Sequence, residues 1–543
     1  MVDHAAKIKE TLERRDKSIP DYARLSAPPA ESVQNVLDVP KGSGLLTDKE
    51  LKITENYDAS ALLRLIARGD LTSEEVTLAF IKRASIATQL VNCCTEIMAD
   101  EALLRAKKLD HEYKMTGKLS GPLHGLPVSF KEHILIKDKI VHSSYVAWLD
   151  NIEPADSLIY ETLVMLGCVP FCRTTQPQAV MHLETNSNIY GHTTNPYNRN
   201  HTPGGSSGGE SALLALRGSP LGVGGDIGGS IRNPASLTGL WGFKPSCNRI
   251  PGGTKGLHRG RETILATNGP LCHSLEDLIL FMRVLVDAEP WRKEPSLVPI
   301  PWHMPELTKE TLTVGIIWSD GVVKPLPPIQ RAMDKVTDAM RGIGIKTVDF
   351  EPYNHAESWD IISQLYYTNG ALDEFALFKD GGEEMLPLTK WLFTQPGVKE
   401  HSHDESNEIL LRRNRYRTAY ARHWLAQEEK HGTKIDVLLC PVGPGPAPKL
   451  GTSKYWTYTS VWNLVDYPGC AFPVTQVQPK DAEPSGYVPQ AGVEKEVWDS
   501  YDLNESRGLP VGLQLVGRRF EEEKVLAAMG VISGALEAAS AHL

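Results

Sequence analysis

A run of glycines and serines between residues 203 and 234 holds the residue types in this sequence that are best suited to chemistry. The run reads PGGSSGGESALLALRGSPLGVGGDIGGSIRNP. Two small-residue loops, residues 204–209 and 222–229, flank a short apolar segment, Ser211–Leu216, which we expect to be helical. Glycine allows close backbone approach, and consecutive amides form a concave set of donors for an anion. The anion is either a phosphate or the oxyanion that develops when a carbonyl is attacked.

The position of the serines favours the oxyanion. A phosphate-binding loop would follow the pattern G-x-x-x-x-G-K-[ST] or G-x-G-x-x-G. Neither pattern occurs in this segment, and no lysine follows the glycines. Ser230 instead stands directly after Ile227, Gly228 and Gly229, so a nucleophile would lie beside the amide donors. We therefore predict a serine that attacks a carbonyl with the help of a neighbouring base.

The same segment contains the pattern G-x-S-x-G at residues 204–208. In a nucleophile elbow this pattern follows directly on a hydrophobic strand. Here the preceding residues, 195–203, read NPYNRNHTP, which is polar and rich in proline. The sequence therefore argues against an α/β-hydrolase elbow.

Helix and strand signals surround this segment along the chain. Thr47 is followed three residues later by Glu50, which predicts a capping box at a helix start, and Thr72 is a second predicted N-cap. After a turn at Gly121 the residues alternate up to Phe130, as in a strand. Strands and helices alternate through residues 57–350 and again near 435–543, which indicates a mixed α/β fold. The predicted helices are residues 59–68, 72–90, 158–167 and 274–286, and a short buried strand follows the third, up to residue 171.

The chain divides unevenly by composition. Residues 1–56 are predicted to form a helical and irregular N-terminal extension, with a charged helix at Ala5–Arg15 and a proline-marked stretch after it. Residues 57–543 show no internal repeat and no clear linker, so we predict a single catalytic domain. Residues 479–507 are poor in apolar side chains and are predicted to be a surface insertion within it.

Composition excludes several classes of protein. With 57 Lys and Arg and 67 Asp and Glu the formal net charge is −10, which disfavours binding to nucleic acid. No segment has the roughly 18 apolar residues that span a bilayer, and no secretory signal is visible, so we expect a cytoplasmic protein without membrane contact. The eight cysteines form no C-x-x-C pair and are predicted to be reduced, mostly buried thiols.

Two histidine motifs superficially suggest a metal. His401 and His403 lie beside Asp404 in a polar run that is typical of a solvated loop. His182 and Glu184 imitate the H-x-E of zinc deaminases, but no P-C-x-x-C follows. No H-E-x-x-H occurs either, so we predict neither a metal nor an organic cofactor.

A long composite pattern in this sequence resembles the amidase signature family of serine hydrolases. The glycine and serine core at 204–209, the segment from Asp226 to Arg232 with Pro234, and the spacing from Ser206 to Ser230 all match that family. Further matching segments are 121–131 (GPLHGLPVSFK), Pro177–Gln178, Gly191, Asn195–Pro196, 439–441 (LCP) and 508–517 (GLPVGLQLVG). The likeness covers about residues 57–535. The N-terminal extension and the stretch 289–302 look most similar to fungal acetamidase-like general amidases.

The resemblance implies the amidase signature fold, an α/β fold whose central mixed, twisted sheet is covered by helices on both faces. It also implies a Ser–Ser–Lys group in which Ser230 is the nucleophile, Ser206 the bridging serine and Lys131 the base. The family's bridging serine follows a cis peptide, here between Gly205 and Ser206. The backbone amides of the segment Ile227–Ser230 would form the oxyanion hole.

Other family positions suggest supporting roles. Asp226 and Arg232 match residues that support the loop, and Ser207 matches a supporting hydroxyl. Val180 lies where the family's substrate-contacting segment runs. Gly225 departs from the family, because many members have threonine before the aspartate, and any hydroxyl contribution there is lost.

The chemistry of a lysine base is consistent with the local sequence. Lys131 must be neutral to accept a proton, although a free lysine titrates near pH 10.4. Leu126, Val128 and Phe130 precede it, so desolvation is expected to lower its pKa. Lys131 would then draw the proton of Ser230 through the hydroxyl of Ser206.

We therefore predict an amidase that hydrolyses the C–N bond of small carboxamides through an acyl-enzyme. A carbamate, aryl-amide or ester hydrolase of the same family is one alternative, and the glutaminase subunit of an amidotransferase is another. A non-catalytic scaffold with this fold is disfavoured because Lys131, Ser206 and Ser230 are all present. Residues 350–400, including Trp359, Tyr366 and Tyr367, are candidates for the acyl pocket. The expected partner is a small-molecule amide, and the sequence leaves open whether the chain forms a homodimer.

Overall fold

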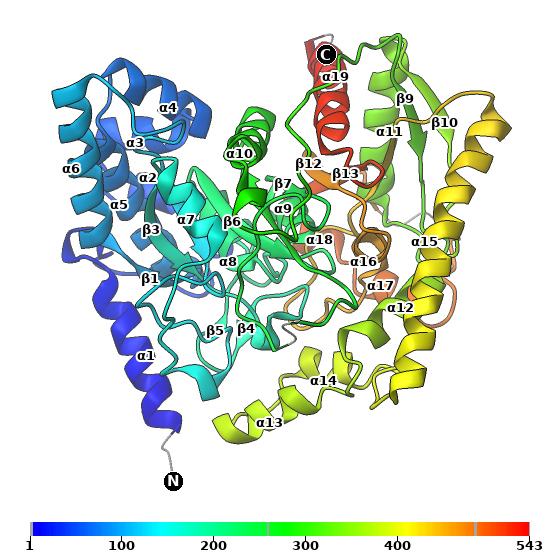
Figure 1. Cartoon of the computed structure of the whole chain (residues 1–543), viewed down its shortest axis with the longest axis horizontal. Helices are drawn as coiled ribbons and strands as arrows, with labels where there is room; N and C mark the ends of the chain where they lie inside the picture. Colours follow the sequence, from blue (N-terminus) through cyan, green and yellow to red (C-terminus); the bar gives the residue numbers. More distant parts are fainter. Residues whose placement is uncertain (1–3, 258–259, 483–485, 542–543) are drawn as a thin grey trace.

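A computed structural model of the chain describes residues 4–257, 260–482 and 486–541. A mixed sheet of eleven strands runs through the molecule, with both parallel and antiparallel neighbours (Figure 1). Its strands, in spatial order, are β1 (Cys94–Ile97), β3 (Val169–Thr174), β2 (Pro127–Lys131), β6 (Leu221–Asp226), β8 (Thr267–Cys272), β7 (Trp241–Lys244), β12 (Gly469–Gln476), β13 (Pro510–Val516), β11 (Val437–Pro441), β9 (Thr313–Ile316) and β10 (Lys346–Asp349). A separate short hairpin consists of β4 (Asn186–Ser187) and β5 (Gly191–His192).

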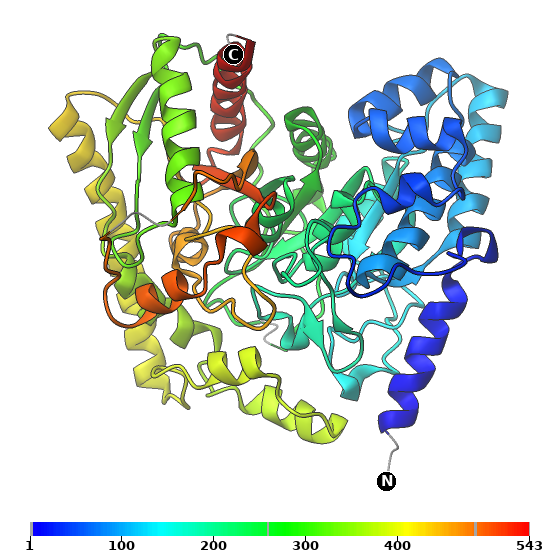
Figure 2. The ribbon, with the colours of Figure 1, turned by 180° about the vertical axis from the view of Figure 1, so that it is seen from behind.

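Helices cover the sheet on both faces, as the α/β prediction requires (Figures 1 and 2). The N-terminal helices gather around β1, β2 and β3, and α11 and α19 pack on each other beside β12 and β13. None of the helices in the described ranges combines the length and apolarity needed to cross a bilayer. The helices of the first half are α1 (His4–Ser18), α2 (Val39–Gly42), α3 (Asp48–Asn56), α4 (Ala59–Arg68), α5 (Ser73–Val91), α6 (Ala99–Thr116), α7 (Leu158–Met165), α8 (Gly208–Ala215), α9 (Arg232–Thr238) and α10 (Leu275–Asp287). Those of the second half are α11 (Pro327–Gly342), α12 (His355–Tyr366), α13 (Leu372–Gly381), α14 (Pro387–Phe393), α15 (His403–His431), α16 (Thr457–Leu464), α17 (Val493–Asp499), α18 (Leu503–Ser506) and α19 (Glu522–Ala541).

The helix starts that were predicted from capping residues are confirmed. The side chain of Thr47 accepts a hydrogen bond from the backbone N–H of Glu50, and Thr72 forms the same capping box with Glu75. Helix α4 has the predicted bounds and is followed by Gly69 in the left-handed conformation. Each cap satisfies a backbone donor that the first helical turn leaves unpaired, so these short-range signals fix helix starts reliably.

Two predicted helix boundaries differ from the structure. The helix that was expected to continue to Gly167 ends at Met165. The short helix after the first serine loop begins at Gly208 rather than at Ser211. Glycine disfavours a helix, but here packing decides: a Cβ at Gly209 would lie 2.4 Å from the backbone nitrogen of Thr175. The two glycines let the first turn of α8 approach its neighbours.

The N-terminal segment and the segment 479–507 both pack on the rest of the chain. Helix α1 lies against β1, and Ile19 and Ile53 belong to the main hydrophobic core. In the second segment Trp498 is buried and its Nε1 donates to the carbonyl of Lys324 at 3.0 Å. The segment therefore contributes buried contacts of its own. The division into an extension, one catalytic domain and an insertion stays a prediction.

Strands β2 and β6 place the predicted chemistry at one edge of the sheet. They are parallel neighbours, and each ends on a residue that the sequence singled out, Lys131 and Asp226. The carboxyl ends of parallel strands open into a common crevice, which is where ligands bind in sheets of this kind. All eight cysteines are buried and unpaired, as predicted.

Candidate active site

Lys131 is buried at the end of β2 and contacts the first serine loop. Its Nζ donates a hydrogen bond to Ser206 Oγ at 2.7 Å, and the residue is 1% exposed. Burial lowers the pKa of Lys131 to about 7, against the opposing charges of Asp226 and Glu210. The expected direction is thus observed, because low polarity around the amine penalises its charged form. A large fraction of this lysine is neutral at neutral pH.

The loop that carries Ser206 is fixed in an unusual backbone conformation. The peptide bond between Gly205 and Ser206 is cis, as the family resemblance implied. The N–H of Gly205 donates to Asn233 Oδ1 at 3.3 Å, and a Cβ at Gly205 would lie 2.2 Å from the carbonyl oxygen of Glu184. No larger residue fits between these groups.

The two serine loops are joined by backbone contacts. The N–H of Ser207 donates to the carbonyl of Ser230 at 3.1 Å. The Oγ of Ser207 lies 3.4 Å from both the N and the O of Gly225, on the strand before the second loop. Ser206 and Ser230 both line one cavity with Lys131. Among the described residues, the side chain of Ser230 has no hydrogen-bond partner within range, so its hydroxyl faces the cavity.

Asp226 and Arg232 form a fully buried ion pair beneath the second loop. Asp226 Oδ1 accepts from the N–H of Gly229 at 2.8 Å, and Oδ2 accepts from the N–H of Ile231 at 3.1 Å. The Arg232 guanidinium contacts both oxygens at 3.1 Å. Although burial alone would raise the pKa of Asp226, the guanidinium holds it well below its usual range. The carboxylate therefore stays charged and shapes the loop from inside.

The predicted oxyanion hole needs one correction. The N–H of Gly229 is one of the four predicted donors, but it is already bound to Asp226. The amides of Ile227, Gly228 and Ser230 make no such contact with another group of the described chain. A loop this tight cannot turn every amide outward, because some must satisfy the buried carboxylate below. Three of the four predicted donors are thus left without such a bond, and their role as an oxyanion hole stays a prediction.

Two side chains from distant helices hold the peptide units of this loop. Tyr366 Oη donates to the carbonyl of Ile227 at 2.9 Å, and Thr459 Oγ1 donates to the carbonyl of Gly228 at 2.7 Å. Since the peptide unit is planar, these bonds also fix the directions of the N–H groups of Gly228 and Gly229. The sequence named Tyr366 only as a candidate for the acyl pocket and did not single out Thr459, because both bonds come from elements far away in the chain, α12 and α16.

The cavity beside the serines has a volume of about 370 Å³ and is lined by both polar and apolar side chains. Its polar lining residues include Lys131, His133 and Asn268. Its apolar and aromatic lining residues include Ile227, Leu257, Ile264, Leu365, Tyr366 and Tyr367. Val180 also lines it, with a positive φ of 58°, so this predicted contact residue does face the cavity. Of the three aromatic residues predicted for the acyl pocket, Tyr366 and Tyr367 line this cavity, whereas Trp359 packs against Trp391 and Trp456.

Glu210 is another buried carboxyl that sequence reasoning missed. It lies in the first turn of α8 and accepts hydrogen bonds from Ser129 Oγ at 2.6 Å and from Thr174 Oγ1 at 2.8 Å. Burial raises its pKa to about 8. Burial thus acts on both groups in the direction of the neutral form, while their mutual attraction opposes it.

The histidine motifs that were set aside have structural roles. The run around His403 was expected to be a solvated loop, but His403 and Asp404 form the first turn of α15, capped by Ser402. His182 Nε2 lies 2.6 Å from Thr389 Oγ1, and Glu184 accepts from the backbone amides of Gly451, Thr452 and Ser453. No group of three or more potential metal-binding side chains occurs in the ranges that the structure describes.

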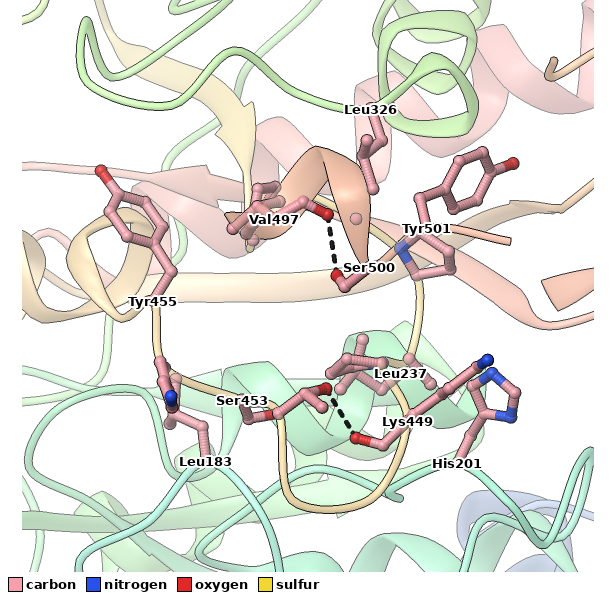
Figure 3. Close-up of a pocket in the computed structure, with 18 of the residues that line it drawn as sticks. Leu183, His201, Leu237, Leu326, Lys449, Ser453, Tyr455, Val497, Ser500 and Tyr501 are labelled. Atoms are coloured by element: carbon pink, nitrogen blue, oxygen red, sulfur yellow. Dashed lines mark hydrogen bonds between the residues drawn. The ribbon is translucent and has the colours of Figure 1, made fainter. Parts of the chain in front are cut away.

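Figure 3 shows a second cavity, of about 270 Å³. Leu237, Lys449 and Ser453 lie on one side of it, and Val497 of α17 and Ser500, which follows that helix, lie on the other. Its wall also includes Asn233, which binds the Gly205 amide, but Lys131, Ser206 and Ser230 do not line it. It is therefore separate from the candidate active site.

Comparison with known proteins agrees with this geometry. The family described as Amidase matches residues 75–526. This chain is 48% identical to a Schizosaccharomyces pombe protein that is named as an amidase. The match covers 95% of this chain and 96% of that protein. The acetamidase of Emericella nidulans is 38% identical over 95% of each chain. Among solved structures, a fatty acid amide hydrolase superposes with a TM-score of 0.91 at 34% identity, covering 98% of this chain and 95% of that one.

A bacterial aryl acylamidase of the amidase signature type shares the fold at 20% identity, with a TM-score of 0.71 over 88% of this chain and 96% of that one. The match to the family extends over most of the chain, and the sheet with its helices is the amidase signature fold. This chain belongs to the amidase signature family, and it is an enzyme that hydrolyses amides.

Proposed function

We propose that this amidase cleaves the C–N bond of small carboxamides through an acyl-enzyme on Ser230, with Ser206 and Lys131 as the proton relay. One observation carries the proposal: Lys131 Nζ donates to Ser206 Oγ at 2.7 Å from a buried position where its pKa is about 7. A lysine with that pKa is a base near neutral pH.

The relay explains how a serine hydroxyl gains nucleophilicity. Neutral Lys131 takes the proton of Ser206 as Ser206 takes that of Ser230, and Ser230 Oγ bonds to the amide carbon. The amides of Ile227, Gly228 and Ser230 then receive the negative oxygen. The proton returns through Ser206 to the nitrogen, the amine leaves, and a water molecule cleaves the ester by the same route.

The cavity supports a small, partly apolar acyl group. Its volume of about 370 Å³ is at the lower end of the range for ligand pockets. The similarity to fungal acetamidases points the same way. Carbamates and esters present the same carbonyl and are expected as secondary substrates. We also propose a cytoplasmic location, on the basis of eight unpaired cysteines, and no contact with membrane or nucleic acid.

A glutaminase subunit is less well supported. Glutamine carries a carboxylate that needs a free cationic partner in the pocket. Besides Lys131, the described residues that line the cavity include two cations, and each forms an ion pair with a carboxylate, although Arg261 Nη1 keeps no hydrogen-bond partner. Lys255 lies 2.6 Å from Glu153, and Arg261 lies 3.0 Å from Asp373. We propose that the chain needs no partner subunit for activity, whether it is a monomer or a homodimer.

A substrate panel tests the proposal. The purified chain is assayed with acetamide, longer aliphatic amides, ethyl carbamate and glutamine, and Ser230→Ala serves as the matched control. We expect release of ammonia from the small amides, little or none from glutamine, and no release by the variant. Glutamine as the preferred substrate, or equal activity of Ser230→Ala, would refute the proposal.

A further inference from the structure

His133 lies in the candidate active site without a part in the Ser–Ser–Lys relay. It follows Lys131 by two residues, is 5% exposed and lines the same cavity as Ser206 and Ser230. Burial and the nearby charge of Lys131 hold the pKa of His133 well below its usual range. The imidazole is therefore neutral, and one of its two ring nitrogens is a hydrogen-bond acceptor.

Neighbouring residues determine which nitrogen that is. Gln176 Nε2 lies 2.5 Å from Glu132 Oε2, and a carboxylate can only accept, so the amide nitrogen of Gln176 faces it. The backbone amides of His142 and Ser143 hold the same carboxylate, at 2.7 and 3.0 Å. Gln176 must then turn its Oε1 toward His133 Nδ1, at 2.8 Å. Nδ1 carries the proton, and Nε2 is the acceptor.

The acceptor nitrogen lies beside Gly225 in the wall of the cavity, where glycine leaves the position without a side chain. A Cβ at Gly225 would lie 3.1 Å from His133 Nε2 and 3.5 Å from Asn268 Oδ1. Asn268 donates its Nδ2 to the carbonyl of Pro251 at 3.3 Å, which leaves Oδ1 as a second acceptor at this point. Nε2 accepts no hydrogen bond from the part of the chain that the structure describes. Where many family members carry threonine, this chain has glycine and two acceptors.

We propose that His133 Nε2 and Asn268 Oδ1 bind the N–H groups of the leaving amine, and afterwards the water that replaces it. The inference rests on the proposed acyl-enzyme route. His133, Gly225 and Asn268 line the same cavity as Ser206 and Ser230. Within it the apolar side chains suit the acyl group, and these two acceptors suit the nitrogen of the substrate. A carboxamide nitrogen carries two hydrogens and ammonia three, which matches two acceptors. His133 takes no proton: the nitrogen receives one from protonated Lys131 through Ser206, the C–N bond breaks and the amine departs.

Comparing an amide with an ester substrate distinguishes binding of the leaving amine by His133 from a purely structural role of this residue. The leaving oxygen of an ester has no N–H to donate, so acylation by an ester gains nothing from these acceptors. The value of kcat/KM reports the steps up to acylation only, and it can be compared for an amide and the methyl ester of the same acid. Loss of one hydrogen bond to the departing nitrogen is expected to reduce the amide value about tenfold.

The test uses His133→Phe, which keeps a ring and removes the acceptor. We expect kcat/KM to fall about tenfold for the amide and to stay within about twofold for the ester. The rate of labelling by a fluorophosphonate, which needs an activated serine but no N–H, should stay the same. His355→Phe is the matched control: His355 is a buried histidine outside this cavity, and its loss should leave the ratio of amide to ester unchanged.

Equal loss for amide and ester, or no loss for the amide, would overturn the assignment of His133. The proposed function fails separately, if the unmodified enzyme does not react with the fluorophosphonate. Should His133→Phe not fold, Gly225→Thr gives a second test, because its side chain fills the open position beside Nε2. Gly225→Thr should lower the ratio of kcat/KM for the amide to kcat/KM for the ester, as His133→Phe does. An unchanged ratio would again overturn the inference.

Discussion

Lys131→Met removes the buried amine at the end of β2 and keeps a side chain of similar length. We expect this variant to lose activity and yet to unfold less readily than the unmodified enzyme at pH 6. Both effects have one cause: burial lowers the pKa of Lys131 from 10.5 to about 7. Desolvation keeps the amine neutral, which lets it act as a base, and the same desolvation makes its protonated form destabilise the folded protein.

The sign of the stability effect follows from proton binding. Between pH 7 and 10.5 the unfolded chain binds a proton at Lys131 that the folded chain lacks, so the free energy of unfolding rises with pH across this window. Below pH 7 Lys131 is protonated in both states, so burying its charge lowers the free energy of unfolding by the full amount. The two pKa values differ by about 3.5, and each pKa unit corresponds to about 1.4 kcal/mol, which gives about 5 kcal/mol.

The hydrogen bond to Ser206 reduces this gain. Methionine leaves the Ser206 hydroxyl without its partner at 2.7 Å, which costs about 1–3 kcal/mol. The net stabilisation of Lys131→Met is therefore about 2–4 kcal/mol at pH 6, with little or no gain at pH 10.

The same pKa determines the pH dependence of the unmodified enzyme. Only neutral Lys131 accepts a proton, so kcat/KM for an amide should rise about tenfold per pH unit up to about pH 7 and then level off. With the ordinary pKa of 10.5, only about one molecule in 3000 would hold a neutral lysine at pH 7. His133 does not produce this inflection, because its pKa is held far lower.

The assay is urea unfolding at pH 6 and pH 10, followed by tryptophan fluorescence, together with the pH profile of kcat/KM. Lys139→Met is the matched control. Burial would lower the pKa of Lys139, but Glu96 and Glu101 raise it, so its loss should destabilise the protein at pH 6. The reasoning is refuted if Lys131→Met is destabilised at pH 6, or if kcat/KM is flat between pH 5 and 7.

Three further predictions concern the nucleophile, the intermediate and the loop. Ser230→Ala should remove nearly all activity with an unchanged unfolding transition; a folded variant that keeps a tenth of kcat would move the nucleophile elsewhere. Hydroxylamine should divert acyl groups to hydroxamate with the same hydroxamate-to-acid ratio for an amide and an ester of one acid, and unequal ratios would exclude a shared acyl-enzyme. Arg232→Met should destabilise the protein by about 3–5 kcal/mol in urea unfolding, because it strands the buried Asp226 carboxylate. A loss below about 1 kcal/mol would show that the ion pair does not hold the loop.

Most elements of the fold could be predicted because their signals are local. The capping boxes at Thr47 and Thr72 and the periodic helix Ala59–Arg68 depend on residues within a few positions of one another. The order of strands in the sheet has no such signal. Strand β12 pairs with β7 on one side and β13 on the other, although more than 200 residues separate it from the first.

The candidate site divides in the same way. The glycines and the two serines lie within one short segment, so Ser206 and Ser230 could be singled out from the sequence. Lys131 lies far from that segment and was identified by the family resemblance. The direction of the pKa change of Lys131 also followed from its apolar neighbours. Only the tertiary structure decided that the Gly229 amide is used by Asp226, since that depends on how the loop closes.

Tertiary structure also decided the residues that hold the site from a distance. Arg232 reaches Gln514 and Asn463 on separate elements, and Tyr366 pins the carbonyl of Ile227. His133 owes its free acceptor to Gln176 and to the missing side chain at position 225. Sequence determines which groups are available and how each short segment turns. Which groups meet, in which orientation and at what distance from water, is set by packing between segments that are remote in sequence, and that packing also fixes pKa and hydrogen-bond direction.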